Sequence, residues 1–145
     1  MPLCMEQTIA DADFIVALVN SEDSNHDRAK SLAQDLSARA IQVILNNITL
    51  YEILTVLSLK GFKQKALALY SLAQTGEMFV LVYATVMTEK NAYRYFQSAL
   101  SKNISFADCL LLATADEHRV SGIISFDKHM RIKKDIPIID GIGGA

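Results

Sequence analysis

The sequence predicts an α/β fold in which a mainly parallel sheet is covered on both faces by helices. Short runs rich in β-branched residues alternate along the chain with longer amphipathic segments, and strands joined through helices pair in parallel by right-handed crossovers. The chain has 145 residues, 51% of them hydrophobic, which suffices for one sizeable core. We therefore expect a single domain over residues 1–145, with a flexible tail at about 141–145, where the sequence reads GIGGA.

In the first half of the chain, strands are expected where β-branched residues cluster, and helices where apolar residues recur every three or four positions. Gly61 separates two helices that would otherwise run together. The expected elements are a strand at 8–11, helices at 14–20 and 25–38, a strand at 41–45, and helices at 50–60 and 63–75.

The same criteria apply to the second half, in which a basic linker precedes the last strand. The expected elements are a strand at 78–82, helices at 87–102 and 106–120, and strands at 122–125 and 136–139.

Composition argues against several classes of protein. No apolar run reaches the length of a membrane span, and the opening MPLCMEQT does not resemble a secretory signal. Cys4 and Cys109 lie far apart and form no CxxC pair, which disfavours a zinc knuckle or a disulfide framework and fits a reducing, cytoplasmic setting. The formal net charge of −2 is not typical of a nucleic-acid-binding domain.

Four acidic residues occupy equivalent places at the expected strand-to-helix junctions. They are Asp11, at the end of the first strand, Glu52 and Asp108, near the start of two helices, and Asp127, just past the strand at 122–125. Ligands of open parallel sheets bind at the carboxyl ends of the strands. We expect all four carboxylates to face one cleft.

Each acid also has a purely structural interpretation. Thr49–Glu52 and Ser105–Asp108 both fit the capping-box pattern, in which the acid bonds back to the start of its helix. Asp127 could cap a short turn, and Asp11 could simply end a strand. Taken singly, the structural and functional interpretations are about equally good.

The expected gathering of the carboxylates favours a metal site. Two carboxylates about 5 Å apart repel by roughly 3 kcal/mol at an effective dielectric constant of 20. Mg²⁺ or Mn²⁺ relieves that repulsion and prefers oxygen ligands, whereas the sequence has no paired His or Cys spacing of the kind that zinc uses. The sequence therefore predicts a divalent-metal site with Asp11, Glu52, Asp108 and Asp127 as ligands.

Four segments in order resemble the PIN-domain ribonucleases, and among them the VapC-type toxins of prokaryotic toxin–antitoxin pairs. The segments are IADADFIVALVN, NITLYEILTVL, SFADCLLLATADEHRV and IISFDKHM, which together extend over roughly residues 8–140. The resemblance implies an α/β/α sandwich and an Mg²⁺- or Mn²⁺-dependent endoribonuclease whose catalytic residues are the same four acids. It also places Ser105 beside the metal, while Thr49 precedes Glu52 by the same spacing.

One departure from the family concerns the residues after Asp11. The family often has Thr or Ser there and then Ser or Asn, whereas this chain has Ala12 and Asp13. Because positions 11 and 13 of a strand share a face, Asp13 is expected to assist or replace Asp11 as a ligand.

Several residues are candidates for contact with RNA or with partner proteins. Lys128 and Arg131 follow Asp127 and are expected to bind the RNA backbone, and two bound dications would turn the net charge of −2 into +2. Tyr93, Tyr95 and Phe96 could stack on bases, although packing is the simpler role. A surplus of apolar residues suggests an interface, which by resemblance means a homodimer and a groove for an antitoxin: Leu50, Tyr51, Leu54, Leu57, Leu67 and Tyr70.

Other functions remain open from the sequence. The DAD at 11–13 is compatible with a dehalogenase-like phosphatase, but the later lysine and paired acids of that class are absent. A non-catalytic α/β binding module, a receiver-type phospho-acceptor switch and an inactive PIN scaffold are further alternatives; a receiver would need a lysine ending its last strand, where this chain has IPII and Asp140.

Overall fold

The fold is a three-layer α/β/α sandwich around a parallel sheet, as the sequence predicts. The structure is a computed structural model that describes residues 5–99, 103–127, 130 and 135–142. Within these residues, five strands pair in the order β3-β2-β1-β4-β5, and every pairing is parallel. The strands are β1 (Gln7–Ala10), β2 (Gln42–Asn46), β3 (Val80–Val82), β4 (Gly122–Ile124) and β5 (Ile138–Ile139).

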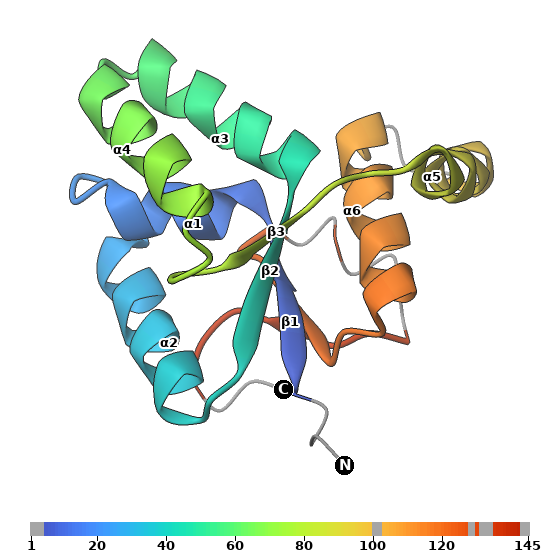
Figure 1. Cartoon of the computed structure of the whole chain (residues 1–145), viewed down its shortest axis with the longest axis horizontal. Coiled ribbons are helices and arrows are strands. Elements are labelled where there is room, and N and C mark those ends of the chain that lie inside the picture. The colour runs from blue at the N-terminus through green and yellow to red at the C-terminus, as the bar shows by residue number, and fades with distance from the viewer. Residues whose placement is uncertain (1–4, 100–102, 128–129, 131–134, 143–145) are drawn as a thin grey trace.

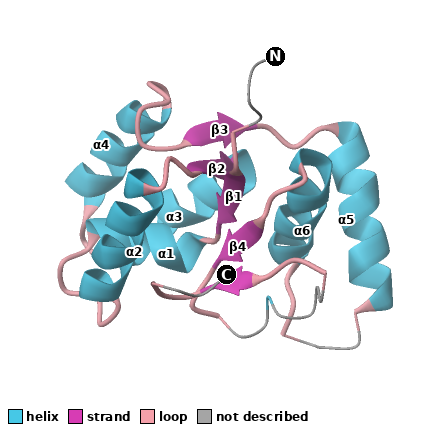
Figure 2. Ribbon diagram, turned by 90° about the horizontal axis from the view of Figure 1, so that it is seen from below, coloured by secondary structure: helices cyan, strands magenta, loops and turns pink. Residues whose placement is uncertain are grey.

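Helices cover both faces of the sheet. The helices are α1 (Ala12–Val19), α2 (His26–Ala38), α3 (Asn47–Leu59), α4 (Lys63–Ala73), α5 (Val86–Ser98) and α6 (Phe106–His118). Figures 1 and 2 show α1 to α4 on one side of the sheet and the pair α5 and α6 on the other. No helix in the described part of the chain is long and apolar enough to cross a membrane.

The core divides into two clusters because successive strand residues point to opposite faces. Ile9 and Ile44 belong to the cluster under α5 and α6, whereas their neighbours Ala10 and Leu45 belong to the cluster under the other helices. β1 is the central strand, with Ile9 opposite Ile44 on one side and Ile123 on the other. This central position places the residue after β1 in the middle of the carboxyl edge of the sheet.

The expected elements are all present, but several boundaries differ. α1 begins two residues and α3 three residues earlier than predicted, because Asp11, directly after β1, and Asn46, the last residue of β2, cap the two helices at once. The expected helix at 87–102 ends at Ser98, and residues 100–102 lie outside the described residues. The last strand is limited to Ile138–Ile139, and the end of the expected tail, 143–145, is also outside the described part.

Candidate active site

The carboxyl edge of the sheet brings together the acids that follow β1 and β4 and those near the starts of α3 and α6. Asp11 lies directly after β1, and its backbone N–H donates to the carbonyl of Ile124 at the end of β4. Asp127 follows β4 by three residues. Parallel pairing therefore sets two of the predicted carboxylates side by side at adjacent strand ends.

Asp11 is the most buried of these acids. Its backbone is extended, its side chain caps α1 by accepting from the Ala12 N–H at 2.8 Å, and the residue is 9% exposed. Burial raises the pKa of the Asp11 carboxyl above its ordinary value; hydrogen bonds from Ser125 and Ala12 oppose that rise, and the charges of Asp108 and Asp127 add to it. Asp11 thus lies within electrostatic reach of two other predicted ligands.

Ser125 links Asp11 to Asp127 and was not identified from the sequence. Its hydroxyl donates to Oδ2 of Asp11 at 2.9 Å, and the backbone N–H of Asp127 donates to the same hydroxyl oxygen at 3.0 Å. Ser125 is 1% exposed, so both bonds lie in a protected environment. The sequence did contain a signal for it, because Ser125 is a polar residue directly after a buried apolar strand and two residues before Asp127.

Asp13 lies in the first turn of α1, so the prediction that it shares a strand face with Asp11 is wrong. The chain turns into a helix at once because Asp11 itself is the cap. Asp13 Oδ2 accepts from the Phe126 N–H at 3.0 Å, and its buried Oδ1 has no hydrogen-bond partner among the described residues. Burial and then the charge of Asp11, with a smaller contribution from Asp127, raise the pKa of Asp13 to about 7.

Glu52 belongs to the second turn of α3, not to its start. Asn46 is the cap of α3, and its side chain accepts from the Ile48 N–H at 2.7 Å. The alternative interpretation of Thr49–Glu52 as a capping box is therefore wrong: Thr49 is a buried residue inside the helix. Partial burial and the charges of Asp11 and Asp108 raise the pKa of the Glu52 carboxyl, which connects it to the same group of acids.

Asp108 caps α6 and also acts electrostatically on two of the other acids. The Ser105–Asp108 capping box is confirmed: Ser105 N–H donates to Oδ2 of Asp108 at 2.9 Å, and Asp108 N–H donates to the Ser105 hydroxyl at 3.0 Å. The cap does not remove Asp108 from the acidic group, because its charge raises the pKa of Asp11 and of Glu52. Ser105 orients the carboxylate of Asp108 through this pair of bonds.

Asp127 is exposed at the rim of the group, where its charge raises the pKa of Asp11 and of Asp13. The predicted RNA-binding residues Lys128 and Arg131 lie outside the described residues.

The chemistry of these donors fits a hard divalent cation. Asp11, Glu52, Asp108 and Asp127 offer only carboxylate oxygens. Burial is the main cause of the raised pKa values of Asp11 and Glu52, and the charges of neighbouring acids add to it, so a bound positive charge would favour the ionised forms. In the described part of the chain, no three His, Cys, Asp or Glu side chains stand close enough together to enclose an ion. The carboxylates thus influence one another electrostatically, but they do not form a closed coordination shell.

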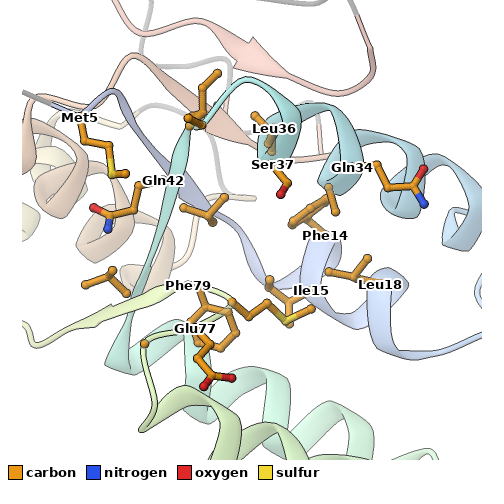
Figure 3. Close-up of a pocket in the computed structure, with 17 residues that line it drawn as sticks. Met5, Phe14, Ile15, Leu18, Gln34, Leu36, Ser37, Gln42, Glu77 and Phe79 are labelled. Atoms are coloured by element: carbon orange, nitrogen blue, oxygen red, sulfur yellow. The ribbon is translucent and has the colours of Figure 1, made fainter.

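A separate apolar cavity of about 580 Å³ lies at the opposite edge of the sheet (Figure 3). It is bounded by α1, α2 and the starts of β2 and β3, with Phe14, Ile15 and Phe79 among its lining residues. Among the described residues that line it, Glu77 is the one that is charged, and none of them is a candidate ligand. With a mainly apolar lining and a single carboxylate, the cavity is a poor candidate for metal or phosphate chemistry.

Comparison with known proteins agrees with this fold. A family model described as the PIN domain matches residues 8–135. The fold is similar to Mycobacterium tuberculosis VapC20, a toxin that cleaves the sarcin–ricin loop, with a TM-score of 0.75 and 21% identity over 86% of this chain and 93% of that chain. No curated protein sequence matches this chain.

Two further similar structures come from other bacteria. FitAcB from Neisseria gonorrhoeae gives a TM-score of 0.69 with 17% identity, over 92% of this chain and 96% of that chain. VapBC2 from Rickettsia felis, solved with a DNA fragment from its promoter, gives a TM-score of 0.68 with 11% identity, over 93% and 98%. At these identities the similarity concerns the fold.

Proposed function

The chain belongs to the PIN-domain family, and from that premise we propose that it is a metal-dependent ribonuclease that cleaves RNA phosphodiester bonds. The observation that carries the proposal is electrostatic: Asp11 at the centre of the carboxyl edge is coupled to Asp108, Asp127 and Glu52, although these acids lie far apart in the sequence. A group of this kind, buried at one end, is suited to a dication, because a positive charge offsets the mutual repulsion of the carboxylates.

In this proposal Asp11, Glu52, Asp108 and Asp127 hold one or two Mg²⁺ or Mn²⁺ ions. Such an ion supplies Lewis-acid chemistry, polarising a phosphate and lowering the pKa of a bound water. The protein residues orient the donors: Ser125 fixes one oxygen of Asp11, and Ser105 fixes one oxygen of Asp108. No protein nucleophile is needed.

The partners of this proposed nuclease follow from its relatives and from its surface. The similar structures include complexes of toxin and antitoxin, so we propose that this chain is the toxin of such a pair. Of the residues expected at an interface, Leu50 and Leu57 are buried in the core, whereas Tyr51, Leu67 and Tyr70 are about half exposed. These three side chains on α3 and α4 remain the proposed homodimer contact.

The proposal is tested by incubating a structured and an unstructured RNA with Mg²⁺, Mn²⁺ or EDTA and following cleavage. Asp108→Asn should lower the cleavage rate by at least about 100-fold, since even the partners that orient metal ligands contribute 10–100-fold. Asp116→Asn, an exposed position two turns further along α6, is the matched control and should cleave normally.

Cleavage that persists in EDTA, or that Asp108→Asn leaves intact, would contradict the proposal. Labelling by acetyl phosphate without any cleavage would favour the receiver-type switch.

A further inference from the structure

One face of α5 has no partner within the described part of the fold. Its residues recur at intervals of three and four, so they share one side of the helix. The buried residues of α5, Thr88 and Ala92, lie on the opposite side, toward α6. Together with Phe106, this face lines an open groove of about 620 Å³. The residues of the face are Val86, Glu89, Lys90, Tyr93, Arg94 and Gln97.

The groove combines positive charge with aromatic rings. Lys90 and Arg94 outnumber Glu89, and neither takes part in the two ion pairs found between described residues, Arg28–Asp140 and Arg39–Asp35. Tyr93 is 54% exposed. Basic side chains beside exposed aromatic rings are typical of surfaces that bind single-stranded nucleic acid, because bases stack on the rings and phosphates pair with the cations.

Phe106 connects this groove to the candidate active site. It opens α6, and Asp108 follows two residues later in the first turn, about 3 Å further along the axis but about 200° around it, so the two side chains leave opposite sides of the start of the helix. The ring of Phe106 is held in place by an edge-to-face contact with Phe96, with 5.6 Å between centroids. A strand that placed a phosphate at Asp108 and continued around the start of α6 would therefore reach an ordered aromatic surface with nucleotides further along.

We propose that the α5 groove binds nucleotides that flank the scissile phosphate of a single-stranded RNA. In it Tyr93 and Phe106 stack on bases, while Lys90 and Arg94 contact the backbone. This inference rests on the proposed nuclease function for its substrate. A base-paired segment is disfavoured, because its bases are already stacked and offer no free face to the rings.

The test is fluorescence anisotropy with a short labelled single-stranded oligoribonucleotide, in EDTA so that the RNA stays intact. Tyr93→Ala should weaken binding by about tenfold, the effect expected of one stacked base, whereas Tyr93→Phe keeps the ring and should bind as wild type does. Arg94→Ala should reduce the slope of log K against log salt by about 0.7, and the control Lys30→Ala, on α2, should leave it unchanged.

The outcomes separate this inference from the proposed function. If Mg²⁺-dependent cleavage occurs but Tyr93→Ala changes neither Kd nor KM, the groove is not a substrate site while the nuclease stands. If no RNA is cleaved but binding still depends on Tyr93 and Arg94, the groove binds RNA and the nuclease proposal fails. A change in molar mass by light scattering on Tyr93→Ala, with RNA affinity unaltered, would identify the face as a contact between copies and overturn the inference.

Discussion

At the scale of single residues, the site depends on two hydrogen-bonded links between the start of α1 and the turn after β4. Ser125 joins the side chain of Asp11 to the backbone of Asp127 through two hydrogen bonds. The carboxylate of Asp13 accepts a hydrogen bond from the backbone N–H of Phe126. The short turn after β4 therefore holds three acids in place, Asp11, Asp13 and Asp127. The functional side chains are positioned by neighbours that the spacing of acidic residues alone did not identify.

Ser125→Ala tests the first link. The substitution removes the hydroxyl that donates to Asp11, so a carboxylate that is nine-tenths buried loses one of its hydrogen-bond donors. We therefore expect the free energy of unfolding to fall by about 1–3 kcal/mol. RNA cleavage should fall by about 10–100-fold, as for other groups that orient metal ligands.

Ser121→Ala is the matched control. It removes an exposed serine at the other end of β4, whose hydroxyl donates to Glu6. Chemical denaturation and cleavage rates should distinguish the two serines, and equal effects of both substitutions would contradict a positioning role for Ser125.

Asp13 makes the stability of the metal-free protein depend on pH. Its pKa is raised from 3.8 to about 7, so the folded form binds a proton more tightly than the unfolded chain does. The contribution of Asp13 to stability is thus greatest below about pH 4 and falls as the pH rises to about 7. At about 1.4 kcal/mol for each pKa unit, the loss is on the order of 4 kcal/mol.

Asp13→Asn should therefore raise the Tm of the metal-free protein at about pH 8 and change it little at about pH 4. The asparagine oxygen still accepts from Phe126 N–H, so the turn is kept. Differential scanning calorimetry in EDTA at several pH values measures this, with the exposed Asp27→Asn on α2 as the control. A Tm shift independent of pH would show that Asp13 does not ionise unfavourably.

At the scale of elements, helix starts decide which predictions hold. The capping box of α6 was visible in the sequence because Ser105 and Asp108 sit directly before the apolar run. The start of α3 was misplaced because Asn46, its true cap, is also the last residue of β2 and reads as part of the strand. A residue that serves two elements at once gives no boundary signal of its own.

Asn46 is completely buried and joins three elements. Besides capping α3, it donates from Nδ2 to the hydroxyl of Thr114 on α6 at 2.6 Å. Asn46→Ala should cost about 2 kcal/mol in the free energy of unfolding, from the lost cap and the lost buried bond, and should reduce cleavage because α3 carries Glu52.

Asn25→Ala provides the comparison for Asn46. Asn25 holds the same N-cap position on α2 but makes no side-chain cap bond there, so its replacement should cost less than about 0.5 kcal/mol in urea denaturation. Comparable losses at both positions would contradict the importance assigned to the Asn46 bonds.

At the scale of the whole molecule, the strand order creates the site. Placing β1 between β2 and β4 brings residues near 11, 52 and 127 to one edge, and α6 adds Asp108 from the layer above. The alternation of elements predicts a parallel sheet, and a parallel sheet predicts that these acids share an edge. Side-chain detail such as the Ser125 link depends on backbone angles of a few residues, which periodicity does not encode.

The claim on which this account depends is that the carboxyl edge binds a divalent cation. The most direct measurement is an anomalous difference map from crystals of the protein soaked in Mn²⁺, with Asp108→Asn crystals treated in the same way. We predict a peak within contact distance of the Asp11 and Asp108 carboxylates that weakens or disappears in the variant. No peak at this edge at saturating Mn²⁺, or a peak that Asp108→Asn leaves unchanged, would contradict the assignment.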